Sequence, residues 1–176
     1  GIIEAGVQAD NSRNASGDLV VNAQTVNTRG NLLASRNLAI TAAQALTNKG
    51  AVIQGKTVSV KTATLTNQGE TARLYGLQNL TISAPAIVNM GGLIRFGEGQ
   101  VATLDSVSVD NRGGQIVASD LTVTADAINN RGGALHGQEQ LTLTGNTLDN
   151  SADGQISGKR LNLTARDTFT NQGGLV

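Results

Sequence analysis

The stretch 128-INNRGGALHGQEQLTLTG-145 contains the whole pattern on which the fold depends. An apolar residue lies two positions before an Asn, a Gly pair follows, a second apolar residue comes next at Leu135, and the stretch ends on LTLT. LTLT alternates apolar and polar residues, which is typical of a strand with one buried face. Asn and Gly favour tight turns because both tolerate positive φ. The stretch therefore predicts short strands joined by turns.

The same pattern recurs about every 20 residues along most of the chain. One column holds the turn Asn, and in the first repeat Thr28 stands in its place: Asn48, Asn67, Asn89, Asn111, Asn130, Asn150 and Asn171. A second column holds the apolar residue that follows the Gly positions: Leu32, Val52, Leu74, Ile94, Ile116, Leu135 and Ile156. A fixed period of this length indicates a repeat architecture with eight repeats.

Two further columns complete each repeat. An apolar pair of the LTLT type occurs in every repeat except the fifth, where Val101 and Thr103 replace it. Small residues follow the second apolar column, at Ser35, Gly55, Gly76, Gly97, Ser119, Gly137 and Gly158. Asp105 stands where other repeats close the strand with a small residue, so we expect a locally irregular fifth turn. The string GETARLYG contains about two extra residues, which predict a bulge or a short loop that lifts Tyr75 toward solvent.

Each repeat thus contains about three strands, and each strand is too short to bury a face alone. The compact solution is a coil in which every repeat makes one turn and pairs in parallel with the next, roughly 4.8 Å away. The aliphatic columns then form the interior, and the stacked Asn amides are placed to bond to one another along the axis. We expect residues 19–176 to form one continuous solenoid and residues 1–18 to form an irregular end rung or a loop.

Composition supports this interpretation and disfavours several functions. Hydrophobic residues make up 39% of the chain but aromatic residues only 2%, there are 22 Gly and one Pro, and there is no Cys. An aliphatic core suits thin, regular layers, and the missing Cys excludes disulfides and thiolate chemistry. Thirteen basic and thirteen acidic residues balance without clustering, which disfavours nucleic-acid partners. No apolar run is long enough to span a bilayer, and a secretion signal, if one exists, is expected outside this chain.

The strings INNRGGALHG, VDNRGGQIVAS and FTNQGGLV, spaced by LTVTA, LTLTG and LNLTA, resemble the haemagglutinin repeats of large two-partner-secretion exoproteins. That family includes filamentous haemagglutinins, adhesins and the stalks of contact-dependent growth inhibition toxins. The resemblance covers about residues 19–176. It implies an all-β, right-handed parallel β-helix with about eight turns of three short strands.

The resemblance also implies a function. It implies export through an outer-membrane transporter and display on the bacterial cell surface as a structural rod, without catalysis and without a cofactor. A cell-surface receptor or a glycan is the candidate binding partner, and the resemblance identifies neither. The leading hypothesis is therefore a secreted stalk that extends a tip and itself adheres.

A carbohydrate-active β-helix is the alternative from another class, because parallel β-helices also form polysaccharide lyases and hydrolases. Such an enzyme needs two carboxyl groups that face one groove. The candidates cluster around the fifth and sixth turns, at Asp105, Asp110, Asp120 and Asp126. The register places them on different faces, so solvated turn residues are the favoured interpretation.

Three other features have weaker functional interpretations. His136 is the only histidine, and a single His without Cys or a second His does not predict a metal site. The Thr pairs Thr122/Thr124 and Thr142/Thr144 resemble an ice-binding array, but the same face is irregular elsewhere, and Thr favours exposed strands in any case. A basic edge for sulfated glycans is conceivable at Arg29, Lys49, Arg112 and Arg131. Acidic neighbours favour a mixed, solvated edge there instead.

Overall fold

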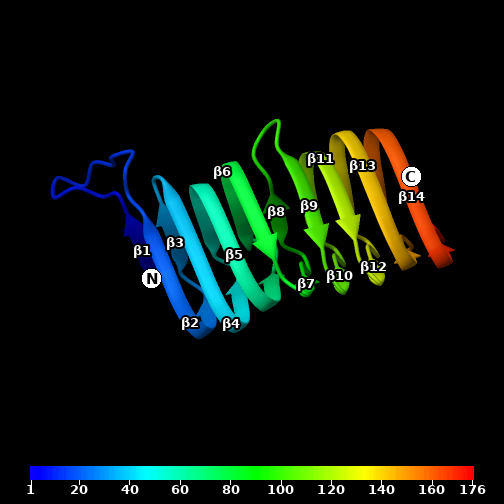
Figure 1. Ribbon diagram of the computed structural model, residues 1–176, viewed down its shortest axis with the longest axis horizontal. Helices are drawn as coiled ribbons and strands as arrows, with labels where there is room; N and C mark the ends of the chain where they lie inside the picture. Colours follow the sequence, from blue (N-terminus) through cyan, green and yellow to red (C-terminus); the bar gives the residue numbers. More distant parts are fainter.

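The computed structural model describes all 176 residues and contains strands and turns but no helix. The strands are β1 (Ile2–Ala5), β2 (Leu19–Thr28), β3 (Asn31–Ala34), β4 (Asn37–Lys49), β5 (Val52–Gln68), β6 (Arg73–Ser83), β7 (Ala86–Val88), β8 (Leu93–Arg95), β9 (Val101–Asp105), β10 (Ser108–Asp110), β11 (Gln115–Thr124), β12 (Ala127–Asn129), β13 (Ala134–Asp149) and β14 (Gln155–Thr170). They wind into a rod with the chain ends at opposite ends of its axis (Figure 1). The repeat thus forms a parallel β-solenoid of about eight turns, as the sequence predicted.

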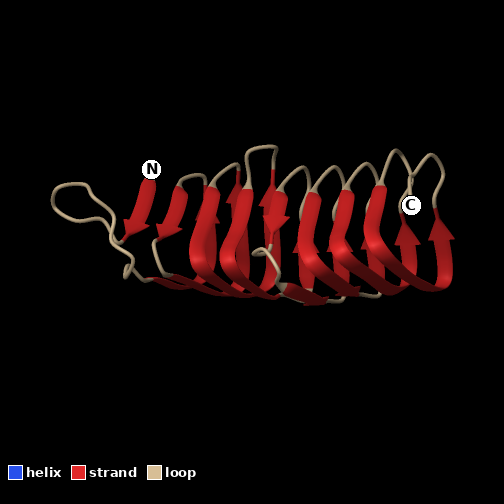
Figure 2. Ribbon diagram, turned by 90° about the horizontal axis from the view of Figure 1, so that it is seen from above, coloured by secondary structure: helices blue, strands red, loops and turns tan.

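Every turn of the solenoid contributes one segment to each of three parallel faces. The first face contains β1, β3, β8 and the first parts of β5, β6, β11, β13 and β14. The second face contains the LTLT-type segments, and the third ends at the turn Asn and contains β7, β10 and β12. Long strands such as β5 and β13 bend around the corners between faces. The segments lie side by side along the axis, as Figure 2 shows.

The interior is built from columns of aliphatic side chains. The column on the first face runs in strand register through Leu32, Ile53, Leu74, Ile94, Ile116, Leu135 and Ile156, all of which are buried. The expectation of Val52 in this column is wrong, because Val52 pairs with Arg73 and is only half-buried. Ile53 lies five residues after its turn Asn, as Ile94, Ile116 and Leu135 do. Val52 and Ile53 are both apolar, so the sequence alone did not show which of them faces inward.

The fifth turn is irregular because its inward positions are shifted by one residue. No polar side chain replaces an inward apolar one. Ala102 and Leu104 pair with Leu121 and Val123 and are buried, so Val101 and Thr103 face outward. Asp105 pairs with Thr124 and is exposed. The tight corner that follows is occupied by Ser106, whose hydroxyl donates a hydrogen bond of 2.8 Å to the carbonyl of Ala84.

The small corner column also lies one residue earlier than expected at three places. In register it reads Ala34, Gly55, Gly76, Phe96, Ala118, Gly137 and Gly158, so it includes neither Ser35, Gly97 nor Ser119. The consequence is greatest at Phe96, which is 3% exposed in a column otherwise made of Ala and Gly. At the next inward position, Ala102 replaces the Leu or Val of other turns. This smaller side chain offsets the larger volume of the Phe96 ring.

The insertion near Tyr75 does not lift that residue from the rod. The extra residues lie in the turn Gly69–Ala72 before β6 and at the following corner, where Leu77 and Gln78 stand opposite the single Lys56. Tyr75 lies within β6, in register with Gln54 and Arg95, and is half-buried. The insertion is therefore accommodated by a turn and a register shift, but the expectation that it lifts Tyr75 toward solvent is wrong.

Residues 1–18 form one paired strand and a loop. Ile2–Ala5 pairs in parallel with Asn31–Ala34, which places β1 on the first face. A loop then projects between Val7 and Arg13, which form an antiparallel bridge. The structure contains no helix that could cross a lipid bilayer.

Candidate functional site

The turn Asn residues form a continuous buried ladder along the rod. In each pair, the side-chain amide nitrogen donates to the side-chain oxygen of the Asn one turn later, and the donor–acceptor distances are 2.7–2.8 Å from Asn48 through Asn67, Asn89, Asn111, Asn130 and Asn150 to Asn171. The first six are fully buried. Asn171 lies on the last turn and is exposed.

Each ladder amide also holds its own turn to the next one. The amide nitrogen of Asn111 lies 3.2 Å from the carbonyl of Gly114 and 3.0 Å from that of Ala134. The same two kinds of contact recur at Asn89, Asn130 and Asn150. The Gly114 carbonyl also accepts a hydrogen bond of 2.8 Å from the Ala134 N–H, so the ladder amide supplies a second donor to a corner carbonyl. The extra bond stabilises the corner, because a carbonyl oxygen has two lone pairs to satisfy. This arrangement is structural and contains no reactive group.

The two Gly residues of each turn have different roles. Gly113 and Gly132 have φ of +62° and +61°, as a turn with a left-handed third residue requires. A Cβ on Gly114 or Gly133 would instead lie 1.8 or 2.0 Å from the carbonyl oxygen of the preceding turn's Asn. The second Gly is therefore needed for the close approach of successive turns.

The carboxylates proposed for the enzymatic alternative do not converge. Asp110 is bound by Arg112, and Asp120 lies at the opposite end of the second face from Asp105. Asp105 and Asp126 do line one shallow hollow, of about 140 Å³, but both are exposed. Ligand pockets are usually about 300–1,000 Å³. The geometry therefore offers no groove in which two carboxyl groups could flank a sugar linkage.

The other candidate residues lie apart from one another. His136 faces outward and its Nδ1 lies 2.8 Å from the Ser157 hydroxyl. No group of three His, Cys, Asp or Glu residues is placed to hold a metal ion. Thr122 and Thr124 stack on Thr142 and Thr144, but Asn162 and Asp105 interrupt the same columns.

The four basic residues of the proposed edge divide into two pairs. Arg112 bonds to Asp110 at 2.7 Å, and Arg131 approaches Asp149 at 3.4 Å. The hydrogen bond that Arg112 donates to the Asp110 carboxylate raises the pKa of Arg112. Arg29 and Lys49 have no ion-pair partner and border an open hollow near the first turns. The structure thus does not bring the four together as one charged surface.

Ion pairs join neighbouring turns on the surface of the rod. The Arg36 guanidinium lies 2.5 Å from Asp18, and this hydrogen bond lowers the pKa of the Asp18 carboxyl to about 2. Lys159 lies 2.6 Å from Glu139 and lowers the pKa of that carboxyl. Exposed pairs of this kind contribute little to stability.

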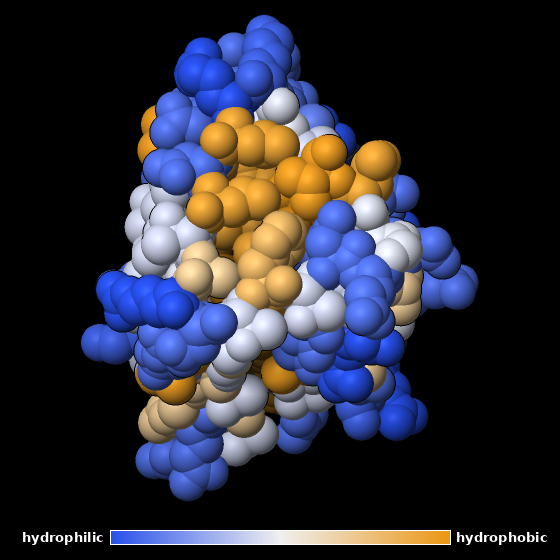
Figure 3. Space-filling model, turned by 90° about the vertical axis from the view of Figure 1, so that its right-hand side faces the viewer, coloured by the Kyte–Doolittle hydropathy of each residue, from blue (hydrophilic) through white to orange (hydrophobic).

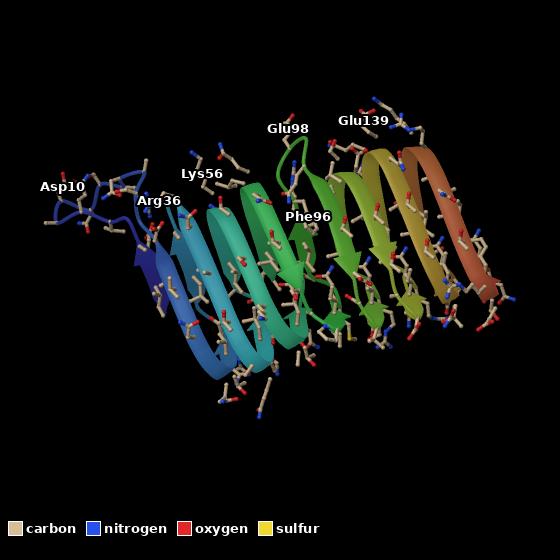
Figure 4. All side chains as sticks on the ribbon, in the orientation of Figure 1. Asp10, Arg36, Lys56, Phe96, Glu98 and Glu139 are labelled. Carbon is tan, nitrogen blue, oxygen red and sulfur yellow. The ribbon has the colours of Figure 1, made fainter.

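A hollow of ligand size beside Tyr75 was not predicted. It measures about 330 Å³ and is lined by Gln54, Tyr75, Gly76, Leu77, Arg95, Phe96, Gly97 and Glu98. The loop between β8 and β9 forms one wall, with Phe96 at its base and Glu98 near its tip (Figure 4). Two of the chain's three aromatic residues lie within this short interval, next to the one repeat that departs from the pattern. That coincidence is the sequence signal that could have indicated the site.

Comparison with known proteins identifies the repeat. The family model described as "Haemagglutinin repeat" matches residues 5–93 and 79–173. The chain is similar to "Toxin CdiA" of Escherichia coli, with 31% identity over 87% of this chain and 5% of the relative. It is also similar to "tRNA nuclease CdiA" of Escherichia coli O6:K15:H31 (strain 536 / UPEC), with 28% identity over 87% of this chain and 6% of the relative. No solved structure matches the chain.

Proposed function

Since the chain belongs to the haemagglutinin repeat family, we propose that it is a structural rod segment of a large secreted bacterial adhesin or contact-dependent inhibition protein, displayed at the cell surface. Its two named relatives are a toxin and a tRNA nuclease, and this chain spans 5% and 6% of their lengths. We propose that a segment of this size contributes to the length of the filament and not to the activity of the whole protein. We place its export with an outer-membrane transporter, as is typical of two-partner secretion.

The observation that carries the proposal is the uninterrupted stacking of turns. All six ladder contacts and the aliphatic columns continue from one turn to the next without a lateral domain or a catalytic groove. Strands inside the rod are paired on both edges except between β6 and β9, so we expect the segment to resist both bending and proteolysis. These are the properties that a stalk needs.

The last turn exposes apolar side chains that earlier turns bury. Leu161 and Phe169 belong to inward columns, yet they are 39% and 46% exposed, whereas Leu141 and Leu148 one turn earlier are 0% and 2% exposed. The apolar patch at this end of the rod is visible in Figure 3.

The test is removal of complete turns from the full-length exoprotein. Deletion of residues 19–176 in register should leave export intact and shorten the surface filament by about 40 Å, because each turn rises roughly 4.8 Å. Filament length is measured by electron microscopy, and export by protease accessibility on intact cells. An unchanged filament length, or the loss of an enzymatic activity while the filament still assembles, would contradict a structural role.

A further inference from the structure

The corner between the first and second faces changes shape at the fifth turn. Other turns pass this corner with one or two unpaired residues, as between Gly55 and Thr57 or between Gly137 and Gln140. At the fifth turn β8 ends at Arg95 and β9 begins at Val101, and the loop between them closes on a hydrogen bond of 3.1 Å from the Gln100 amide to the Gly97 carbonyl. The loop stands out from the rod in Figure 1.

This loop encloses the 330 Å³ hollow together with the fourth turn. Gln54, Tyr75 and Arg95 lie on three successive turns at the same outward position, so their side chains flank one another along the axis. Tyr75 in the middle is half-buried, and Leu77 and the loop lie to its side. The result is an aromatic surface with an amide on one side and a guanidinium on the other.

The polar groups around the hollow are not engaged by the rod itself. Arg95 and Glu98 are exposed and take part in none of the five ion pairs of the protein. Exposed apolar groups accompany them: Leu77 is 58% exposed and Val101 at the end of the loop is 66% exposed. Arg112, in contrast, is paired with Asp110.

We infer that this hollow binds one pyranose ring of a glycan. A sugar ring has an apolar C–H face and a rim of hydroxyl groups, and the hollow presents an aromatic face with donors and acceptors around it. Tyr75 and Leu77 contact the apolar face of the ring, Arg95 and Gln54 donate to its hydroxyls, and Glu98 accepts from them. A volume of 330 Å³ suits one ring with part of a neighbour.

Other ligands fit the lining less well. An aliphatic peptide side chain would leave the charged groups of Arg95 and Glu98 without a partner as it displaced their water. A nucleic acid would be repelled by Glu98, and the chain has no net charge to attract it. The mixed lining therefore favours a neutral, hydroxyl-rich ligand.

The experiment is a titration of the 176-residue chain with methyl pyranosides, followed by amide chemical shifts in nuclear magnetic resonance. The probes are the methyl glycosides of glucose, galactose, mannose and N-acetylglucosamine. For a single ring in an open site we expect a Kd on the order of 1 mM for at least one probe. The amides of Gln54, Tyr75 and Gly97 should shift, and those of the distant His136 should not.

Three variants separate binding from folding. Tyr75→Ala should weaken binding about tenfold or more, through the lost stacking surface. Arg95→Ala, at an exposed position, gives an independent reading if Tyr75→Ala does not fold. His136→Ala is the matched control, because His136 occupies the same outward column two turns beyond Arg95, and it should bind as the parent does.

Two results would overturn the inference. One is the absence of any shift at these amides with every pyranoside at concentrations well above 1 mM, or binding that survives both Tyr75→Ala and Arg95→Ala. The other is a response to the peptide acetyl-Leu-Val-Leu-amide and to no sugar, which would assign the hollow to a protein partner. The stalk proposal does not depend on this site, since the filament-length test would be unaffected.

Discussion

Replacement of Asn111 by Ala tests the buried ladder most sharply. Asn111 is fully buried, accepts from Asn89 at 2.8 Å and donates to Asn130 at 2.7 Å. The truncation leaves the side-chain oxygen of Asn130 without the donor from Asn111, and it removes one hydrogen bond each from the carbonyls of Gly114 and Ala134. The Gly114 carbonyl keeps its bond from the Ala134 N–H. An unsatisfied buried group costs about 1–3 kcal/mol and each further lost hydrogen bond about 0.5–1.5 kcal/mol, so we expect a loss of about 3 kcal/mol in the free energy of unfolding.

The assay is urea unfolding followed by circular dichroism in the strand region. The midpoint should fall while the dependence on urea concentration stays the same, since the surface exposed on unfolding does not change. Asn129→Ala is the matched control: Asn129 is half-buried, and its side chain accepts only from the Arg131 amide at 3.3 Å. We expect that control to cost about 0.5 kcal/mol or less. An equal loss in both variants would refute the reasoning.

Three further predictions follow from the packing and the charges. Gly114→Ala should destabilise the rod by about 3 kcal/mol or more, because its Cβ would lie 1.8 Å from the Asn89 carbonyl. Gly113→Ala, with φ of +62° but open space, should cost about 1 kcal/mol; thermal unfolding that ranks the two in the opposite order would contradict the close-approach argument. Phe96→Ala should cost about 3–5 kcal/mol through the cavity it leaves. Adding Ala102→Leu should recover part of that loss in urea unfolding, and strict additivity would show that the two side chains do not share a volume. The pKa of Asp18, lowered from 3.8 to about 2, predicts that its pair with Arg36 stabilises the fold above about pH 3.8 and that this contribution is lost as pH falls toward 2. The difference in melting temperature between the parent and Asp18→Asn should therefore shrink between pH 7 and pH 2, and a constant difference would contradict this.

The repeat could be predicted from sequence because each column imposes a local chemical requirement. Apolar residues suit inward positions, and Asn supplies both a donor and an acceptor at the buried corner. The period therefore predicted the solenoid and its number of turns. Register within a turn was harder to predict where two neighbouring residues satisfy the same requirement, as Val52 and Ile53 do.

The fifth turn was harder for a different reason. Val101 and Thr103 match the expected spacing, and the shift to Ala102 and Leu104 depends on a loop whose length changes the alternation by one residue. The large Phe96 and the small Ala102 lie on either side of a corner, and their volumes offset each other. The spacing of apolar residues along the sequence does not predict such a pair. The hollow beside Tyr75 likewise depends on three successive turns and on the loop together.

The most direct test of the stacked turns is disulfide formation between engineered cysteines, since the chain has none of its own. His136 and Ser157 are in register on adjacent turns, at a Cα separation of roughly 4.8 Å that a disulfide can span. Val117 and Ser157 lie two turns apart, at roughly twice that separation. The variant with His136→Cys and Ser157→Cys should oxidise completely to an intramolecular disulfide seen by mass spectrometry, and the variant with Val117→Cys and Ser157→Cys should stay reduced. Equal cross-linking in both variants, or none in the first, would contradict the wound and stacked architecture.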